Sequence, residues 1–259
     1  MMKKEISYEV VESSSSPLPK GFLDRLPELF PREGKTIYKG RNEIKNFEVA
    51  GRTVCVKKYS VPPFFNRMFY SWGWRTPKAK RTYDNAQKIL DRGFKTPVQY
   101  GYVLTRENGW LGESYSVGEF VENARTVGQD KKDARLVRAF AHYTARLHAH
   151  GLMHRDYILN NILYRPSGKE YDFTLVDINR FLFRDKPIRG FLQRVNLMQP
   201  FKDQRELKAF VKAYEEADPS SGELCRCVAH LRWWRNRYSQ LKRVLKKIPG
   251  ATWLSKHGK

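Results

Sequence analysis

Apolar residues recur along several short stretches in the first half of the chain. The stretches cover residues 37–49, 54–56, 100–104 and 114–121. Turn residues separate them, with Gly51 after the first and Asn108-Gly109 between the last two. Short apolar stretches bounded by such turns are typical of antiparallel strands. We therefore expect a small antiparallel sheet in this part of the protein.

Apolar residues recur at helical spacing in other stretches. These stretches cover residues 80–92, 130–150, 202–217 and 222–247. The first ends before Gly93, a residue typical of helix C-caps. One helix among strands, followed by a helix-rich remainder, predicts an α+β fold with two lobes that meet near residues 119–124. We expect a loose leader over residues 1–35, which include the polar run 13–19, an N-terminal lobe over 36–121 and a C-terminal lobe over 122–259.

The charge of the chain adds a preference for anionic partners. Among its 259 residues, Lys and Arg number 49 and Asp and Glu 27, a net charge of +22. This surplus predicts attraction to nucleic acid, anionic lipid or a phosphorylated substrate, without choosing among them. No segment approaches the roughly 20 apolar residues of a spanning helix, and the N-terminus lacks a signal peptide. We expect a cytoplasmic protein whose three cysteines are reduced.

One segment carries a specific chemical signature. The residues His154-Arg155-Asp156 and, five positions after the aspartate, Asn161 fit the catalytic-loop pattern H-R-D-x-x-x-x-N. In phosphoryl transfer, Asp156 would serve as the base for the attacking hydroxyl and Asn161 as a magnesium ligand. An apolar run ends at Asp177, which is placed to hold the metal that bridges the phosphates. The pattern predicts an ATP-dependent phosphotransferase that uses Mg²⁺.

A lysine for the phosphates is expected in the N-terminal lobe. Val54-Cys55-Val56-Lys57 matches the V-A-I-K strand of kinases, with Lys58 as a fallback and an ordinary basic edge strand as the alternative. Alternation puts Cys55 and Lys57 on one strand face, with Cys55 under the adenine. Gly40 lies where a phosphate-covering loop belongs, although that loop has one glycine instead of three.

Such a lysine is usually paired with a carboxylate on the following helix. Asp84 is the acid early in the stretch 80–92, although the helical phase suits a partner near Thr82 better. No long activation segment with Ala-Pro-Glu follows Asp177, which argues against protein substrates.

Taken together, these motifs resemble those of the bacterial lipopolysaccharide core kinases, the Kdo/WaaP family within the protein-kinase-like fold. The resemblance covers residues 36–185 and rests on Lys57, the hinge-like Glu119-Phe120-Val121-Glu122, LHAHGLMHRDYILNNILY and LVDINR. It implies ATP-dependent phosphorylation of a Kdo or heptose hydroxyl in the lipopolysaccharide inner core, at the cytoplasmic face of the inner membrane. It also implies that the backbone from Glu119 to Val121 binds adenine.

Two stretches combine aromatic and basic residues. They are residues 62–74 (PPFFNRMFYSWGW) and the segment from 232–238 (RWWRNRY) to Lys247. Either could contact an anionic membrane, and the second could equally be an ordinary helix with one packed face. The alternative function is a catalytically silent, regulatory kinase-like module. Nucleic-acid binding is not expected because no recognised motif accompanies the charge. The sequence leaves the oligomeric state open.

Overall fold

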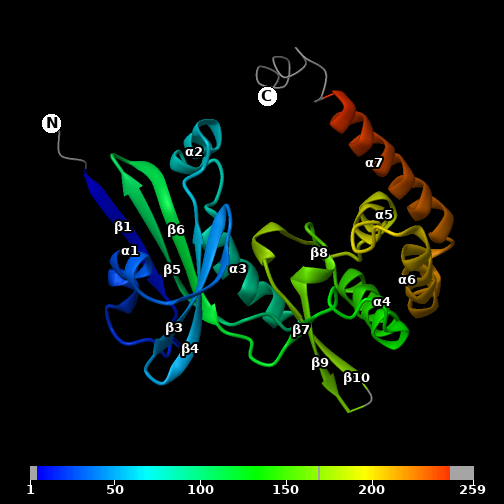
Figure 1. Cartoon of the computed structure of the whole chain (residues 1–259), viewed down its shortest axis with the longest axis horizontal. Helices are drawn as coiled ribbons and strands as arrows, with labels where there is room; N and C mark the ends of the chain where they lie inside the picture. Colours follow the sequence, from blue (N-terminus) through cyan, green and yellow to red (C-terminus); the bar gives the residue numbers. More distant parts are fainter. Residues whose placement is uncertain (1–4, 169, 246–259) are drawn as a thin grey trace. The chain divides into compact units, whose positions relative to one another are not determined.

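The computed structural model of the chain describes residues 5–168 and 170–245. Within them, the protein is a mixed α/β structure with eleven strands and seven α-helices (Figure 1). The chain forms two compact units. The first contains residues up to 125 together with 161–167 and 172–181, and the second contains the remainder. Two short strands, β7 (Arg125–Thr126) and β11 (Phe181–Phe183), lie where the chain passes from one unit to the other.

A six-stranded sheet forms the first unit, in the order β1-β5-β6-β4-β3-β2. Its strands are β1 (Ile6–Glu12), β2 (Lys35–Lys39), β3 (Asn42–Val49), β4 (Arg52–Tyr59), β5 (Gln99–Glu107) and β6 (Trp110–Glu119). All neighbouring strands are antiparallel. The predicted turn joins β5 to β6, where Asn108 and Gly109 have φ of 49° and 79°. A two-residue hairpin with both φ values positive favours this pair of residues. The small antiparallel sheet predicted from the sequence is present.

Within residues 5–35, the structure shows regular elements where a loose leader was expected. Strand β1 pairs with β5 along its whole length, from Ile6 opposite Glu107 to Glu12 opposite Gly101. Helix α1 (Phe22–Arg32) packs on the sheet and buries Leu23, Leu26 and Phe30. These side chains share a core with residues of β3, β4, β5 and β6. The helix also contains Pro27 and Pro31. Because proline is unfavourable inside helices, no helix was predicted here.

Replacing Leu26 with Ala is expected to lower the free energy of unfolding by about 3 kcal/mol, because a fully buried leucine leaves a cavity. The side chain of Leu26 is 0% exposed, whereas that of Ile37 in β2 is 50% exposed. Ile37→Ala is therefore the control, with an expected change below about 0.5 kcal/mol. Urea titrations followed by circular dichroism measure both. Equal stability of the two variants would show that α1 is not part of the core.

Two helices follow β4 and cover a second apolar cluster. They are α2 (Phe64–Ser71) and α3 (Lys78–Asp91), of which only α3 was expected. Tyr70 and Ala79 pack there with Tyr59, Tyr102 and residues of β5 and β6. The first unit is completed by β9 (Ile162–Ser167) and by residues 172–175 of β10 (Glu170–Leu175). Strand β10 is tied to the segment after α3, since Leu175 N donates to Lys95 O at 2.9 Å.

The second unit is mainly helical. It contains α4 (Ala134–Ala149), β8 (Leu152–His154), α5 (Gly190–Leu197), α6 (Gln204–Ala217) and α7 (Cys225–Leu245). Helices α4 and α6 each begin at an aspartate N-cap, Asp133 and Asp203, whose side chain accepts two backbone hydrogen bonds. Helix α5 was not predicted, and the end of the predicted stretch 222–247, with Lys246 and Lys247, lies outside the described residues. None of the helices in the described part of the chain combines the length and apolar character needed to cross a bilayer.

Candidate active site

Strand β4 carries the predicted lysine on the face away from α1. Val54 and Val56 are buried in the core beneath α1, so Lys57 lies on the opposite face. Its Nζ is 2.6 Å from Oδ1 of Asp177, with side-chain exposures of 17% and 35%. Burial by itself would lower the pKa of Lys57, but Tyr59, Asp177 and Cys55 outweigh burial and raise it. The lysine is therefore a fixed positive charge beside a carboxylate 120 positions away in the sequence.

Asp177 is held in place by its neighbours. It follows β10 with φ of 56°, a left-handed conformation that Asp adopts more readily than most residues. Asn179 Nδ2 donates to Asp177 Oδ1 at 2.6 Å. From α3, Asn85 Nδ2 donates to the backbone carbonyl of Ile178 at 2.8 Å. The carboxylate is thus fixed by a lysine, an amide and a buried bond to the adjacent helix.

Asn161 lies beside the segment that carries Asp177. Its backbone carbonyl accepts a hydrogen bond from Val176 N at 3.0 Å. The two predicted metal ligands are therefore on adjacent backbone segments of the first unit. Among the described residues, no group of three or more His, Cys, Asp or Glu is placed to hold a metal. A donor set of one carboxylate and one amide, completed by phosphate oxygens, fits Mg²⁺ and does not fit a zinc site.

Asp156 lies in the loop after β8 in the second unit. Its backbone N–H donates to His154 Nδ1 at 3.1 Å, and its carbonyl accepts from Ile158 N at 2.9 Å. Tyr157 N donates to Gln199 Oε1 at 3.0 Å. Before β8, Gly151 has φ of 71°, and a Cβ there would lie 2.0 Å from the Arg184 carbonyl oxygen, so only glycine fits. The loop is held on both sides of the aspartate.

Buried polar side chains from α4, α5 and α6 form a network that supports the loop that carries Asp156. Asn196 Nδ2 donates to the carbonyl of His154 at 2.8 Å, and Asn196 Oδ1 lies 2.9 Å from His148 Nε2. The other ring nitrogen of His148 lies 3.0 Å from the hydroxyl of Tyr214. Burial lowers the pKa of His148 to about 4. The ring is therefore neutral at physiological pH, and its two hydrogen bonds fix one tautomer.

This neutral histidine makes stability depend on pH. Between about pH 4 and 6.5 the unfolded chain binds a proton at His148 that the folded chain does not. Stability therefore rises with pH through this window and is lost as the pH falls below 6.5, by up to about 3 kcal/mol. Urea midpoints measured from pH 4.5 to 7.5 should show a shallower slope for His148→Gln. The control His150→Gln, at an exposed ring, should keep the wild-type slope, and equal slopes in all three proteins would contradict the assignment.

The predicted pair between Lys57 and a helix acid does not form. Asp84 Oδ2 lies 3.8 Å from Lys80 Nζ on the same helix, and both side chains are well exposed. Toward β4, α3 presents Thr82, whose hydroxyl is 2.8 Å from that of Tyr59. The helical phase explains the difference, because Asp84 lies two residues beyond the position that faces the strand. The carboxylate partner of Lys57 is Asp177.

The remaining predicted residues lie in β4, at or just after the end of β6, and in the turn between β2 and β3. Gly40 forms the turn between β2 and β3, and a Cβ there would lie 2.6 Å from the Tyr38 hydroxyl. Cys55 pairs in register with Gly118, and burial raises the pKa of its thiol to about 11, so it stays protonated. Glu119 ends β6, where its Oε2 accepts from Val98 N at 3.3 Å. Val121 lies two residues further along the chain.

Sequence reasoning missed Asn179 as a member of this site. The residue is 7% exposed and donates to Asp177. A polar residue two positions after the aspartate, within the run Ile178-Asn179-Arg180-Phe181, was the available signal. Its spacing from Asp177 is not part of the motifs that identified the other site residues, so only the fold identifies its role.

Comparisons with known proteins identify a family and a fold for this chain. The profile of the Lipopolysaccharide kinase (Kdo/WaaP) family matches residues 32–214. Among solved structures, one described as WaaP in complex with acyl carrier protein is similar, with a TM-score of 0.57 and 17% sequence identity. The similarity covers 90% of this chain and 98% of that one, and at this identity it shows the fold. No curated protein sequence matches the chain.

Proposed function

Since the chain belongs to the lipopolysaccharide kinase (Kdo/WaaP) family and is a phosphotransferase, we propose that it transfers the γ-phosphoryl group of ATP to a Kdo or heptose hydroxyl of the lipopolysaccharide inner core. The observation that carries the proposal is the 2.6 Å contact between Lys57 and Asp177. It joins a strand lysine to a strand-end aspartate, the two charges that phosphoryl transfer requires at the phosphates.

The chemistry assigns one role to each residue. Lys57 contacts the phosphates of ATP, and Asp156 accepts the proton of the acceptor hydroxyl while orienting its oxygen toward the γ-phosphorus. A bond forms between that oxygen and phosphorus, the bond from phosphorus to the β-phosphate oxygen breaks, and ADP leaves with the electron pair. Asn161 and Asp177 would hold Mg²⁺, which when bound offsets the charge of the phosphates. Asn179 orients Asp177.

The nucleotide base is assigned to the neighbouring strands. We place adenine against Cys55, with the backbone of Glu119 and Val121 as its hydrogen-bonding edge, and Gly40 in the turn over the phosphates. The neutral thiol of Cys55 suits an uncharged base. In this proposal the two compact units act as the two lobes of a protein-kinase-like enzyme.

The test is direct phosphorylation. The full chain is incubated with ATP, Mg²⁺ and de-phosphorylated lipopolysaccharide core, and mass spectrometry detects the addition of one phosphate. Fragmentation then assigns the phosphate to a Kdo or a heptose. Absence of transfer to any core sugar, while nucleotide still binds, would refute the proposed function.

We also propose that α2 and the loop after it contact an anionic membrane. Five of their aromatic side chains are exposed, and Phe64 and Trp74 reach 67% and 70%. These five residues form the aromatic patch: Phe64, Phe65, Phe69, Trp72 and Trp74. Their rings contact one another and Trp110, with Trp72 and Trp74 at 5.5 Å between centroids. Large exposed aromatic surfaces near basic residues are typical of proteins bound at the lipid headgroup level.

Replacing Trp72 and Trp74 with Ser is expected to weaken binding to vesicles containing anionic phospholipid about tenfold or more, because the apolar area entering the interface is lost. Sedimentation with vesicles measures the bound fraction. The control is the double variant Ile6→Ser and Tyr8→Ser, which removes exposed apolar groups from β1. Equal weakening by both double variants, or by neither, would contradict the role of the aromatic patch.

A further inference from the structure

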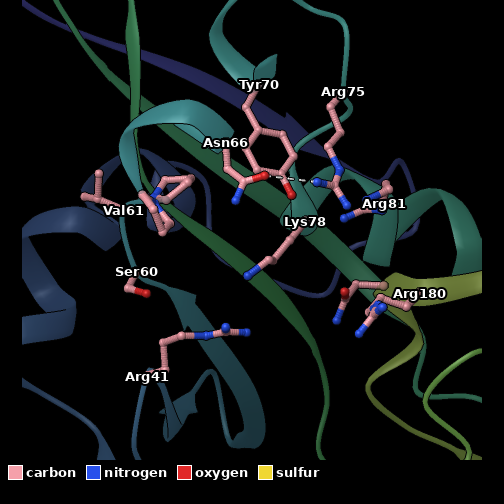
Figure 2. Close-up of a pocket in the computed structure, with 12 residues that line it drawn as sticks. Arg41, Ser60, Val61, Asn66, Tyr70, Arg75, Lys78, Arg81 and Arg180 are labelled. Carbon is pink, nitrogen blue, oxygen red and sulfur yellow. Dashed lines mark hydrogen bonds between the residues drawn. The ribbon is translucent and has the colours of Figure 1, made fainter. Parts of the chain in front are cut away.

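A pocket of about 430 Å³ lies next to the candidate active site, entirely within the first unit (Figure 2). The turn between β2 and β3, the segment 60–75, the first turn of α3 and the residues after Asp177 all contribute to its walls. Five of its twelve lining residues are cationic: Arg41, Arg75, Lys78, Arg81 and Arg180. We call these the basic cluster. Among the described residues that line the pocket, none is acidic.

The basic cluster has few internal partners. In the described part of the chain, none of its members forms a salt bridge. Arg75 Nη1 donates to Asn66 Oδ1 at 3.2 Å, as Figure 2 shows. The Nε of Arg81 is buried and has no hydrogen-bond partner among the described residues. Buried guanidinium nitrogens are nearly always paired in stable proteins, so this donor indicates a place for a ligand acceptor.

The cations also repel one another. Burial lowers the pKa of Lys78, and the nearby charges of Arg41, Arg81 and Lys57 lower it further. The pKa of Arg81 is lowered for similar reasons, first by burial and then by neighbours that include Arg75 and Arg180. Asp177 acts on the pKa of Lys78 in the opposite direction, but its carboxylate is already paired with Lys57 at 2.6 Å. Gathering several like charges around few counter-charges costs stability. Such an arrangement is typical of a site that is completed by an anion.

The pocket adjoins the reacting groups through Asn179, which lines it and donates to Asp177 at 2.6 Å. We propose that the basic cluster binds an anionic substituent of the acceptor sugar, a carboxylate or a phosphate ester, and so positions the acceptor for transfer. This inference rests on the proposed function, because it names the acceptor group that the same active site would recognise.

The arrangement favours the acceptor over the nucleotide as the source of the anion. Lys57, Asp177 and Asn161, which are assigned to the phosphates of ATP, do not line the pocket. One wall is the segment 60–75, which also carries the aromatic patch on α2. An acceptor glycolipid in a membrane bound by the aromatic patch would therefore lie near this wall, to which Arg75 of the basic cluster belongs. Arg and Lys donate strong, charge-assisted hydrogen bonds to carboxylates and phosphates.

The kinetic test compares the double variant Lys78→Gln and Arg81→Gln with a charge-matched control, Lys80→Gln and Lys88→Gln, on the same helix outside the pocket. The pocket variant should raise KM for the core acceptor by roughly tenfold to a hundredfold, whereas KM for ATP changes by less than about threefold. The control should leave both constants near those of the wild type. A rise confined to KM for ATP would assign the pocket to the nucleotide and overturn the proposal, as would an unchanged KM for the acceptor.

A second measurement does not depend on transfer. Inorganic phosphate, titrated against chloride at matched ionic strength, should raise the melting temperature of the wild type and of the control variant more than that of the pocket variant. Without added anions, the pocket variant should melt at or above the wild-type temperature, because repulsion is relieved. Equal phosphate shifts in all three proteins would overturn the inference. If the wild type transfers no phosphate at all, the proposed function fails, and the phosphate titration still decides the pocket.

Discussion

Replacing Asp156 with Asn is expected to lower the rate of phosphoryl transfer about a thousandfold, with ATP affinity within about threefold of the wild type. The amide has the shape of the carboxylate but cannot accept the proton of the attacking hydroxyl. The backbone N–H of residue 156 would still donate to His154 Nδ1, so the loop should keep its conformation. Single-turnover transfer and equilibrium nucleotide binding measure the two quantities separately.

Asp172→Asn is the matched control for this variant. Asp172 is exposed and pairs with Lys95 at 2.9 Å, so its loss removes one negative charge without touching the catalytic loop. Its transfer rate should stay near that of the wild type. If Asp156→Asn kept full biological function, the regulatory reading of the chain would replace the enzymatic one.

Breaking the pair between Lys57 and Asp177 should have the second large effect. Lys57→Met and Asp177→Asn are each expected to lower transfer at least about a hundredfold, because each removes a charge that the phosphates require. Since the two groups act as a unit, the double variant should be little worse than the more severe single variant. The transfer rates of the wild type, the two single variants and the double variant, measured under the same conditions, form a double-mutant cycle that gives the coupling between Lys57 and Asp177.

The adjacent lysine supplies an internal control. Lys58 lies on the other face of β4, where its Nζ is 3.2 Å from Glu113 and 3.9 Å from Glu43. Lys58→Met should lower transfer less than about threefold, in line with the loss of a partly exposed ion pair. A larger loss for Lys58→Met than for Lys57→Met would assign the phosphate contact to Lys58.

The parts of the fold that the sequence revealed are those with strong local signals. Short apolar stretches and the Asn108-Gly109 turn located the central strands, and capped, periodic stretches located α3, α4, α6 and α7. The N-terminal elements were not predicted because β1 is largely exposed and α1 contains Pro27 and Pro31. Their place in the fold depends on long-range pairing and burial, which a local pattern does not encode.

As with the fold, only part of the candidate site could be predicted from the sequence. Lys57, Asp156, Asn161 and Asp177 stand in motifs whose spacing reflects backbone geometry, so they could be found from the sequence. The basic cluster could not, because Arg41, Lys78 and Arg180 come from three distant segments and share no spacing. The helical phase already favoured Thr82 over Asp84 as the position of α3 that faces β4, and the structure agrees. The carboxylate partner of Lys57 could not be found from the sequence, because Asp177 lies 120 positions away.

The bond between Thr82 and Tyr59 bears on how this enzyme could be turned on and off. In protein kinases, activation depends on an ion pair between the strand lysine and an acid of the neighbouring helix. Here the helix contributes a neutral hydroxyl, and the charge of Lys57 is balanced by Asp177 instead. A swing of α3 would therefore break no ion pair with Lys57, but it would break the buried bond from Asn85 to the Ile178 carbonyl that helps to fix Asp177. We expect α3 to act on the site through the position of Asp177 and not through the charge of Lys57.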